Sequence, residues 1–168
     1  MVAYYISVLF FAYICDDIVI SDSGWPNSLK IVPLTITGAG SYNQFSPIPL
    51  ANPNWECVNE VPQNTTDYVK PTAGAQKEAY ALSNLPAEAH TIKAINWCST
   101  FRRVGNPSLL TFKPFFKSGV LEAEGATLAA SRIMDTSYQQ ILAVSPITLG
   151  DWDVTEVNNM EAGIVSAA

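Results

Sequence analysis

The residue types needed for nucleophilic catalysis are sparse in this chain. His90 is the only histidine, so a Ser-His-Asp or Cys-His arrangement would have to use it. It stands between Ala89 and Thr91 just before an extended segment, a context typical of a loop or strand edge. No Gly-x-Ser-x-Gly motif is present to expose a serine, and Cys98 lies inside an alternating strand pattern. We therefore predict no catalytic residue and expect that the protein is not an enzyme.

Paired carboxylates could instead hydrolyse a glycosidic bond, and two pairs have a suitable spacing. Glu122 and Glu124 would point to one face of a strand, about 7 Å apart from two residues of strand rise. They lie in a polar, hairpin-like stretch, so a solvated surface is the simpler interpretation. Asp151 and Asp153 precede a short helical pattern and are explained by helix capping.

The sequence also predicts no metal and no cofactor. Asp16, Asp17 and Asp22 lack the alternating Asp-x-Asp-x-Asp-Gly pattern of a calcium-binding loop. Gly38 and Gly40 are followed by neither a helix nor a suitably placed lysine, so they do not form a phosphate-binding loop.

Tryptophan side chains in loops can stack on sugars, and two of the four are candidates. Trp25 and Trp55 lie in or beside Pro/Asn-rich loops and are the predicted glycan contacts. Trp97 lies in a strand pattern and is expected in the core, while Trp152 is expected beside the C-terminal helix. A carbohydrate-binding receptor or adhesin module is therefore the alternative function.

The three cysteines, Cys15, Cys57 and Cys98, are far apart and have no zinc-knuckle or redox spacing. A disulfide between Cys57 and Cys98 requires that their strands be adjacent. Unpaired buried cysteines, which behave as small hydrophobic residues, are the other interpretation. The sequence leaves both open.

Composition argues against some partners. Charged residues make up 14% of the 168 residues, and the net charge is −6. Soluble domains carry about 25% charged residues, so a surface this poor in charge is expected where neighbouring chains cover it. The nine basic residues form no stripe for a phosphate backbone, which argues against nucleic-acid binding.

The chain opens with an uncharged apolar segment, residues 2–15 (VAYYISVLFFAYIC). It is shorter than the roughly 20 residues of a membrane-spanning helix, and neither a preceding basic residue nor a cleavage site marks a signal peptide. Aromatic and β-branched residues favour a strand. Three interpretations stay open: a core or interface strand, an extended arm inserted into a neighbouring subunit, or a retained membrane-directed segment. The predicted assembly contacts are Tyr4, Tyr5, Leu9, Phe10, Phe11 and Tyr13.

The rest of the sequence consists of short alternating segments separated by turn signals. The two most regular segments, 89–103 and 108–117, predict a hairpin. Further strands are expected over 29–37, 55–58, 77–82, 126–130 and 138–146, with turns at 38–40 and 52–54. The predicted fold class is all-β, an antiparallel β-sandwich or jelly roll with one short C-terminal helix. Residues 1–24 form the apolar arm or strand, and residues 25–168 form the sandwich domain.

The short helix is predicted from residues near the C-terminus. Asp153 and Glu156 have the spacing of a capping box. Val154, Val157 and Met160 form an apolar stripe. Gly163 is expected as the left-handed residue that caps the end of the helix.

Several short motifs occur in an order that resembles a known group of proteins. They are SYNQF at 41–45, NWECVNEVP at 54–62, TTDYV at 65–69, AGAQKEAYAL at 73–82, TIKAI at 91–95 and DWDVTEVNNMEAG at 151–163. Residues 38–165 thereby resemble small virion structural proteins of tailed bacteriophages. Members typically share the elements W-x-x-V-(D/N)-E-x-P, G-Q-K-(D/E)-x-Y-x-L and W-T-x-x-E-V-N-A-L-E-A-G-V. This chain departs from that pattern in its apolar N-terminus and in Asn159 and Met160, where Ala-Leu is usual.

The resemblance implies a β-sandwich particle component without enzymatic activity, assembled in the host cytoplasm. It would be a capsid decoration or fibre subunit or a tail component, located in the virion. Its expected partners are other virion proteins and copies of itself, with neither nucleic acid nor membrane. Under the alternative function the partner is a host-surface glycan.

Overall fold

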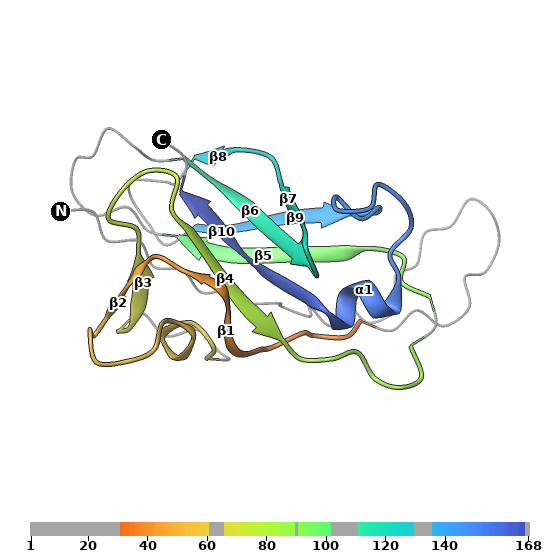
Figure 1. Cartoon of the computed structure of the whole chain (residues 1–168), viewed down its shortest axis with the longest axis horizontal. Coiled ribbons are helices and arrows are strands. Elements are labelled where there is room, and N and C mark those ends of the chain that lie inside the picture. Colours follow the sequence, from red (N-terminus) through yellow and green to blue (C-terminus); the bar gives the residue numbers. More distant parts are fainter. Residues whose placement is uncertain (1–30, 61–65, 90, 102–110, 130–135, 167–168) are drawn as a thin grey trace.

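The computed structural model describes residues 31–60, 66–89, 91–101, 111–129 and 136–166. Within these ranges the chain is mostly antiparallel β-structure with one short α-helix near its C-terminus (Figure 1), so the predicted all-β fold class is confirmed. The predictions for residues 1–24, Trp25 and His90 lie outside the described residues.

The larger sheet has six strands in the order β1–β4–β10–β6–β7, with β8 also paired to β6. All of these pairs are antiparallel. The last strand in the sequence, β10, therefore lies at the centre of the sheet between β4 and β6. The bounds are β1 Ile36–Asn43, β4 Lys77–Leu82, β6 Thr111–Ser118, β7 Leu121–Glu124, β8 Leu128–Ala129 and β10 Met160–Ser166.

A two-stranded sheet of β5 (Ile95–Phe101) and β9 (Thr136–Leu142) covers one face of the larger sheet. Figure 1 shows β5 and β9 behind the larger sheet, crossing its strands at an angle. Trp97 and Phe101 of β5 share one hydrophobic core with Tyr80, Phe116 and Ile164 of the larger sheet. The two layers thus pack face to face, as in a β-sandwich.

A third, small sheet pairs β2 (Ser46–Ile48) with β3 (Tyr68–Lys70), next to the 3₁₀ helix η1 (Asn54–Cys57). The strand predicted over 55–58 is therefore wrong. The hydrogen bond from Asn52 N to Pro49 O closes a turn over residues 49–52, which overlaps the turn predicted at 52–54 only at Asn52. Alternation over so few residues does not distinguish a strand from a single helical turn.

The predicted hairpin between segments 89–103 and 108–117 is wrong. Strand β5 pairs with β9, and β6 pairs with β10, β7 and β8. Both segments have an apolar face, and these faces meet across the core rather than lying in one sheet. The rings of Phe101 and Phe112 stack with centroids 3.5 Å apart. Strands β5 and β6 therefore belong to different layers of the sandwich.

Two glycine predictions are also wrong, for one physical reason. Residues 38–40 belong to β1 instead of forming a turn, and Gly163 belongs to β10 instead of capping a helix. A Cβ at Gly40 would lie 2.7 Å from the carbonyl carbon of Ala79, and one at Gly163 would lie 1.9 Å from Glu78 O. Both glycines therefore allow β1 and β10 to approach β4 closely.

Helix α1 (Val154–Asn158) confirms the predicted cap but not the complete box. Asp153 Oδ1 accepts hydrogen bonds from Thr155 N at 2.7 Å and Glu156 N at 3.2 Å. The Glu156 carboxylate instead accepts a hydrogen bond from Ser145 Oγ. The helix ends at Asn159 because β10 begins directly afterwards. The strand predicted over 77–82 is confirmed as β4, and those over 126–130 and 138–146 correspond in part to β8 and β9.

Candidate functional site

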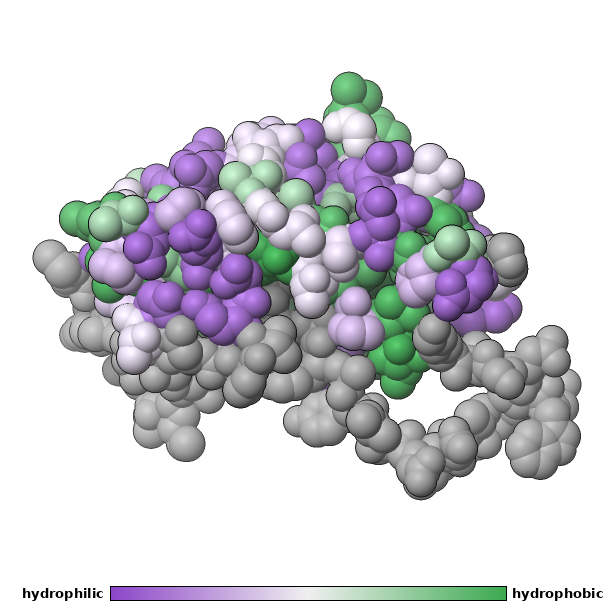
Figure 2. Space-filling view, turned by 90° about the horizontal axis from the view of Figure 1, so that it is seen from below, coloured by the Kyte–Doolittle hydropathy of each residue, from purple (hydrophilic) through white to green (hydrophobic). Residues whose placement is uncertain are grey.

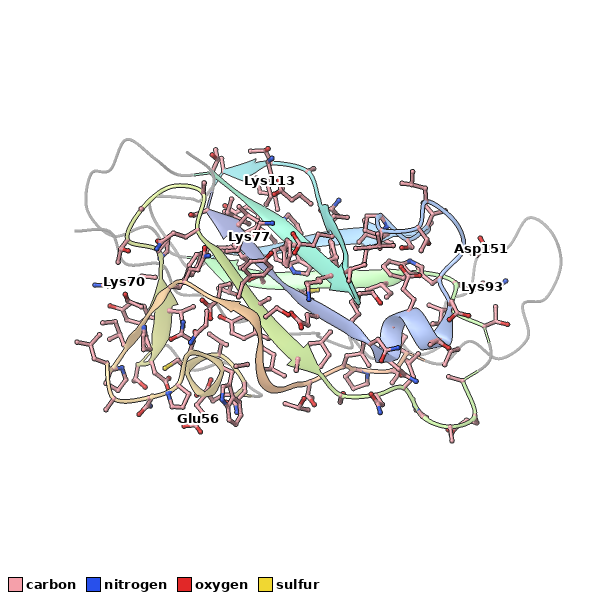
Figure 3. All side chains as sticks on the ribbon, in the orientation of Figure 1. Glu56, Lys70, Lys77, Lys93, Lys113 and Asp151 are labelled. Atoms are coloured by element: carbon pink, nitrogen blue, oxygen red, sulfur yellow. The ribbon has the colours of Figure 1, made fainter. Side chains whose placement is uncertain are left out.

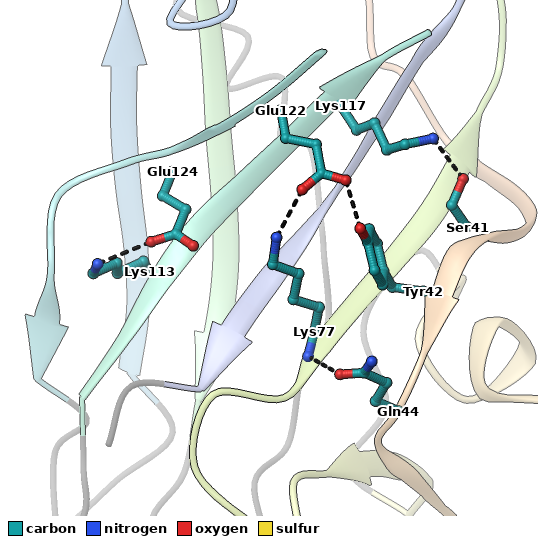
Figure 4. A network of polar contacts seen from close by, with 8 residues as sticks. All are labelled: Ser41, Tyr42, Gln44, Lys77, Lys113, Lys117, Glu122 and Glu124. Carbon is teal, nitrogen blue, oxygen red and sulfur yellow. Dashed lines mark hydrogen bonds and ion pairs between the residues drawn. The ribbon is translucent and has the colours of Figure 1, made fainter. Parts of the chain in front are cut away.

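The outer face of the larger sheet, the face turned away from β5 and β9, carries three lysines and three glutamates. Figure 4 shows part of this layer. Strand alternation places these side chains opposite the core-facing residues of the same strands. We call this set the Lys–Glu layer; its members are Lys77 on β4, Lys113 and Lys117 on β6, Glu122 and Glu124 on β7, and Glu161 on β10.

Its first contacts centre on Glu122. Lys77 Nζ lies 2.7 Å from Glu122 Oε2, and Tyr42 Oη donates to Glu122 Oε1 at 2.6 Å. Lys113 Nζ lies 2.9 Å from Glu124 Oε2. The carboxylates at 122 and 124 therefore point to one face, as the strand period predicts, but each is neutralised by a lysine of its own.

The remaining contacts centre on Glu161, at the centre of the sheet. Its carboxylate accepts hydrogen bonds from Ser41 N and Ser41 Oγ, both at 2.7 Å. Lys117 Nζ donates to Ser41 Oγ at 2.7 Å and lies 3.9 Å from Glu161 Oε1. The layer thus links side chains from all five strands of the main path with no excess charge of either sign.

A small apolar cluster lies beneath the layer. Ala79, Phe115 and Val165 are buried there, although they point away from the main core. Lys77 Nζ lies 5.1 Å from the ring centroid of Tyr42 and 4.7 Å from that of Phe115. The lysine therefore covers aromatic rings while its ammonium pairs with a carboxylate.

The electrostatics of this layer do not favour proton transfer near neutral pH. The hydrogen bond from Lys77 lowers the pKa of Glu122, and the bond to Glu122 raises the pKa of Lys77. Hydrogen bonding to Glu122 also raises the pKa of Tyr42. Each shift moves the pKa of the group further from 7. A general acid or base requires the opposite, a pKa near the working pH. Other charged side chains lie at the periphery in Figure 3: Lys70 on the left, Glu56 at the bottom, and Lys93 and Asp151 on the right.

The inner face of the same sheet contains a buried carboxylate. Glu78 is 1% exposed; its Oε2 accepts from Phe45 N and its Oε1 from Asn54 Nδ2, both at 2.9 Å. Asn54 Nδ2 also donates to Phe45 O at 2.8 Å. Burial raises the pKa of Glu78 to about 7, although the hydrogen bonds from Phe45 and Asn54 act in the opposite direction.

Two further titratable groups lie near Glu78. Tyr80 is fully buried, its hydroxyl has no hydrogen-bond partner within the described ranges, and burial raises its pKa well above the ordinary value. Burial and the nearby Asp67 and Glu60 raise the pKa of Cys57 to about 11. The Cys57 side chain is therefore a neutral thiol at neutral pH and a poor nucleophile. Cys57 and Cys98 are not joined by a disulfide in this structure.

A serine–glutamate pair connects α1 with the preceding loop. Ser145 Oγ donates to Glu156 and accepts from Ile147 N at 3.0 Å and Thr148 N at 3.1 Å. Ser145 is completely buried. Its hydroxyl is engaged as donor and acceptor, so the pair is suited to holding the loop against the helix rather than to nucleophilic attack.

The predicted glycan contacts are not brought together by the described structure. Trp55 lies in η1, half-buried against the core, and Trp25 lies outside the described residues. Trp97 is in the core as predicted, and Trp152 is buried beside α1 with its indole N–H donating to Leu142 O at 2.8 Å. The buried Glu78 was missed by sequence reasoning, although it shares a strand face with Tyr80 and Leu82, which is the signal that would have identified it.

The described part of the chain offers little to a metal or a small ligand. It holds no group of three or more His, Cys, Asp or Glu side chains arranged for a metal. A cavity lined by Phe45, Phe101, Phe112 and Ile164 measures about 10 Å³, close to the space that a single water needs. No described helix has the length and apolar character needed to cross a bilayer.

Comparisons with protein-family models, curated proteins and solved structures give no significant match. The resemblance to virion proteins therefore stays a prediction from the sequence motifs. The functional argument depends on the surfaces and contacts described above.

Proposed function

We propose that this protein is a non-enzymatic structural subunit of a tailed-bacteriophage virion, a capsid decoration or fibre subunit or a tail component, that acts through subunit–subunit contacts. The observation that supports it is a concentration of exposed apolar side chains at one end of the sandwich. The sequence motifs suggest the virion context, and the exposed apolar side chains support a role in subunit contacts.

Five of the seven large apolar side chains that are exposed in the described residues belong to two neighbouring segments. One is the β6–β7 turn, and the other is the end of β9 with the loop that follows it. Exposure reaches 93% at Val120 and 81% at Leu149. We call this set the α1-end surface: Val120, Leu121, Ile141, Val144 and Leu149.

Hydrogen bonds through helix α1 bring the two segments to the same end of the molecule. Ser118 Oγ, just before the β6–β7 turn, donates to Glu156 O at 3.2 Å. Ser145 Oγ, in the loop after β9, donates to the side chain of the same Glu156. Figure 1 shows the end of β9 and helix α1 towards the right of the molecule, with the tip of β6 to the left of α1.

Grouped exposed apolar side chains favour contact with another protein, whereas single ones are common on any surface. In the view of Figure 2, apolar residues reach the surface at separate places among polar ones rather than as one large patch. It is the grouping of the exposed side chains in the α1-end surface that suits a contact made during assembly. The broad outer face is less suited to it, since the charges of the Lys–Glu layer are already paired.

The carbohydrate-binding alternative has weaker support. Trp55, one of the two predicted glycan contacts, packs its ring against the core. A partly buried indole offers a sugar less stacking area than a fully exposed one.

The virion role is tested by probing purified particles from a lysate that produces this chain with an antibody against the domain. Stable association with the particles is the expected result. Particles that lack the chain, from cells in which it is abundant, would overturn the virion role.

The contact surface is tested by sedimentation of the full chain over a range of concentrations. The wild-type protein should self-associate, and the double variant Val120→Asp/Leu149→Asp should shift the equilibrium towards monomer by at least tenfold. Leu50→Asp is the matched control, because Leu50 is 76% exposed but lies in the β2–η1 connection. A wild-type chain that stays monomeric at every concentration, or an equal effect of both variants, would contradict the assigned surface.

A further inference from the structure

Strands β2 and β3 and helix η1 form a lobe beside the inner face of β4. In the described chain β2 and β3 pair only with each other, so no backbone ladder joins them to either layer of the sandwich. Figure 1 shows this lobe at the lower left of the molecule. We call it the flap; its described residues are 45–60 and 66–71. Its buried apolar side chains in the main core are Phe45, Cys57, Val58 and Val69.

Both ends of the flap are held at one place by the side chain of Gln76. Its Oε1 accepts hydrogen bonds from Thr72 N at 2.6 Å and Ala73 N at 2.8 Å, just after β3. Its Nε2 donates to Gln44 O at 2.9 Å, just before β2. The chain therefore enters and leaves the flap at neighbouring points, which is the arrangement of a hinge.

The flap meets the larger sheet at the buried carboxyl of Glu78. The two oxygens accept from Phe45 N and Asn54 Nδ2, and both donors belong to the flap. No lysine or arginine of the described chain forms an ion pair with Glu78. Neutral N–H donors replace the hydration of a carboxylate only in part, so the ionised form is costly here. Moving the flap relieves this cost, since β4 is fixed between β1 and β10.

The packing beneath the flap is incomplete. A cavity of about 10 Å³ lies where Phe45 and Pro71 of the flap meet Phe112 and Ile164 of the larger sheet. Ile164 is the cross-strand partner of Glu78 on β10. The atoms that line a void lack part of their dispersion contacts, so this boundary is easier to open than a close-packed one.

We propose that the flap is a pH-sensitive switch, closed over the inner face of β4 while Glu78 carries a proton and opening when the carboxyl ionises. Opening hydrates the carboxylate and uncovers the apolar underside of the flap. It also admits water to Tyr80 Oη, which is buried without a hydrogen-bond partner within the described ranges. This role goes beyond the proposed virion function and does not depend on it.

The other titratable groups around Glu78 do not respond in the same pH range. Burial raises the pKa of Tyr80 on β4 well above its ordinary value and that of Cys57 in η1 to about 11. Both groups are therefore neutral up to pH 8. Asp67 and Glu60, which act on Cys57, are acidic and do not favour an ionised Glu78. The chain after β1 and strand β10 contribute uncharged neighbours.

The proton balance gives the direction of the change. Burial raises the pKa of Glu78 to about 7 in the closed flap, against 4.5 for a solvated carboxyl. Below pH 4.5 both forms are protonated, so the opening constant does not depend on pH. Between pH 4.5 and 7 opening releases a proton, and the constant rises about tenfold per pH unit. Above pH 7 it levels off, after a total rise of about 300-fold.

The test is hydrogen–deuterium exchange of the full chain, read by mass spectrometry from pH 4.5 to 8, beside the variant Glu78→Gln. At each pH the ratio of wild-type to variant rates removes the intrinsic pH dependence of exchange. In peptides from residues 45–60 this ratio should rise about 300-fold and then level off above pH 7. Glu122→Gln, on the outer face, is the matched control and should exchange like the wild type.

Urea separates opening of the flap from unfolding of the whole domain. Local opening exposes little surface, so low urea should hardly change exchange in residues 45–60 but should accelerate it in β10. If Glu78→Gln does not fold, the wild-type rates divided by those of unstructured peptides give the same opening constant.

Three outcomes overturn the proposal. The first is exchange in the flap whose opening constant is the same at pH 4.5 and pH 7. The second is a rise that persists in Glu78→Gln. The third is equal protection and equal urea dependence in the flap and β10, which would show that the domain opens as one unit. Because the readout is exchange in the purified chain, absence of the protein from virus particles leaves this test unaffected.

Discussion

On the outer face of the larger sheet, Glu122 lies 2.7 Å from Lys77 and its pKa is lowered. One residue along β4 from Lys77, Glu78 points into the core and its pKa is raised to about 7. The period of two along a strand is enough to put neighbours in sequence into opposite environments. Near the surface a lysine stabilises the carboxylate. In the core two N–H donors do not offset the loss of hydration.

The comparison shows which polar groups contribute most to the stability of this fold. The Lys–Glu layer pairs charges that water would otherwise solvate, so each pair contributes little to stability. Glu78 instead supplies the acceptor for Phe45 N and Asn54 Nδ2, which are held where β4, η1 and the chain after β1 meet. Removing that acceptor leaves buried donors unpaired.

The largest expected effect comes from breaking the close backbone contact between β10 and β4. Gly163→Ala would place a Cβ 1.9 Å from Glu78 O, so β10 and β4 would have to separate. We expect a loss of about 3 kcal/mol or more in the free energy of unfolding, measured by chemical denaturation. Gly38→Ala is the control, because a Cβ there meets nothing within 4 Å. A loss at position 163 no larger than that at position 38 would contradict the packing described here.

A smaller effect is expected from the pH dependence that Glu78 imposes. Its pKa is about 7 in the folded protein against an ordinary 4.5. Between these values the unfolded chain has released the proton and the folded chain retains it. The stability that protonated Glu78 contributes is therefore fully present below pH 4.5, and about 3 kcal/mol of it is lost as the pH rises through 7. Glu78→Gln should remove most of this slope in denaturation curves recorded from pH 4.5 to 8.

The outer carboxylate provides the contrasting control. Because the pKa of Glu122 is lowered, its contribution is present above the unfolded pKa and is lost as the pH falls through the folded pKa. Glu122→Gln should leave the decline between pH 4.5 and 7 in place. An equal flattening by both variants would show that the decline does not come from Glu78.

The smallest effects are expected in the Lys–Glu layer. Lys77→Met keeps the aliphatic stem over Tyr42 and Phe115 but removes the ion pair with Glu122. We expect a loss of about 0.5–1 kcal/mol that shrinks in 1 M salt. Lys113→Met should cost less, since its pair with Glu124 is more exposed and lacks a tyrosine partner. A salt-independent loss above about 2 kcal/mol at Lys77 would show that the outer face is not a screened surface.

Local patterns of the sequence predicted whether a residue is buried or exposed better than they predicted which strands pair with each other. Strand β4, the Asp153 cap and the buried Trp97 follow from alternation and capping rules that act within a few residues. The same rules give β5 and β6 apolar faces but contain no information about which strand lies beside each. Adjacent placement in the sequence favoured a hairpin, whereas packing of Phe101 on Phe112 places the two strands in different layers.

The candidate sites show the same division. The sequence indicated that Glu122 and Glu124 share a strand face, but their lysine partners come from β4 and β6, strands that only the sheet order brings alongside. Glu78 shares its strand face with Tyr80, and its donors come from the separate segments that contain Phe45 and Asn54. These partners cannot be predicted from the sequence alone, because the tertiary fold decides which segments lie next to each other.

The amino-acid sequence by itself determined the all-β class, the single capped helix and the alternation that separates core-facing from solvent-facing residues. Each of these results from steric and hydrogen-bonding preferences over a few residues. Only the tertiary structure decided that β10 lies at the centre of the sheet, that Gly163 serves a backbone contact, and that Glu78 is buried among donors. These features depend on contacts between segments far apart in the chain, which form only where burial of a common core outweighs the entropy of bringing the segments together.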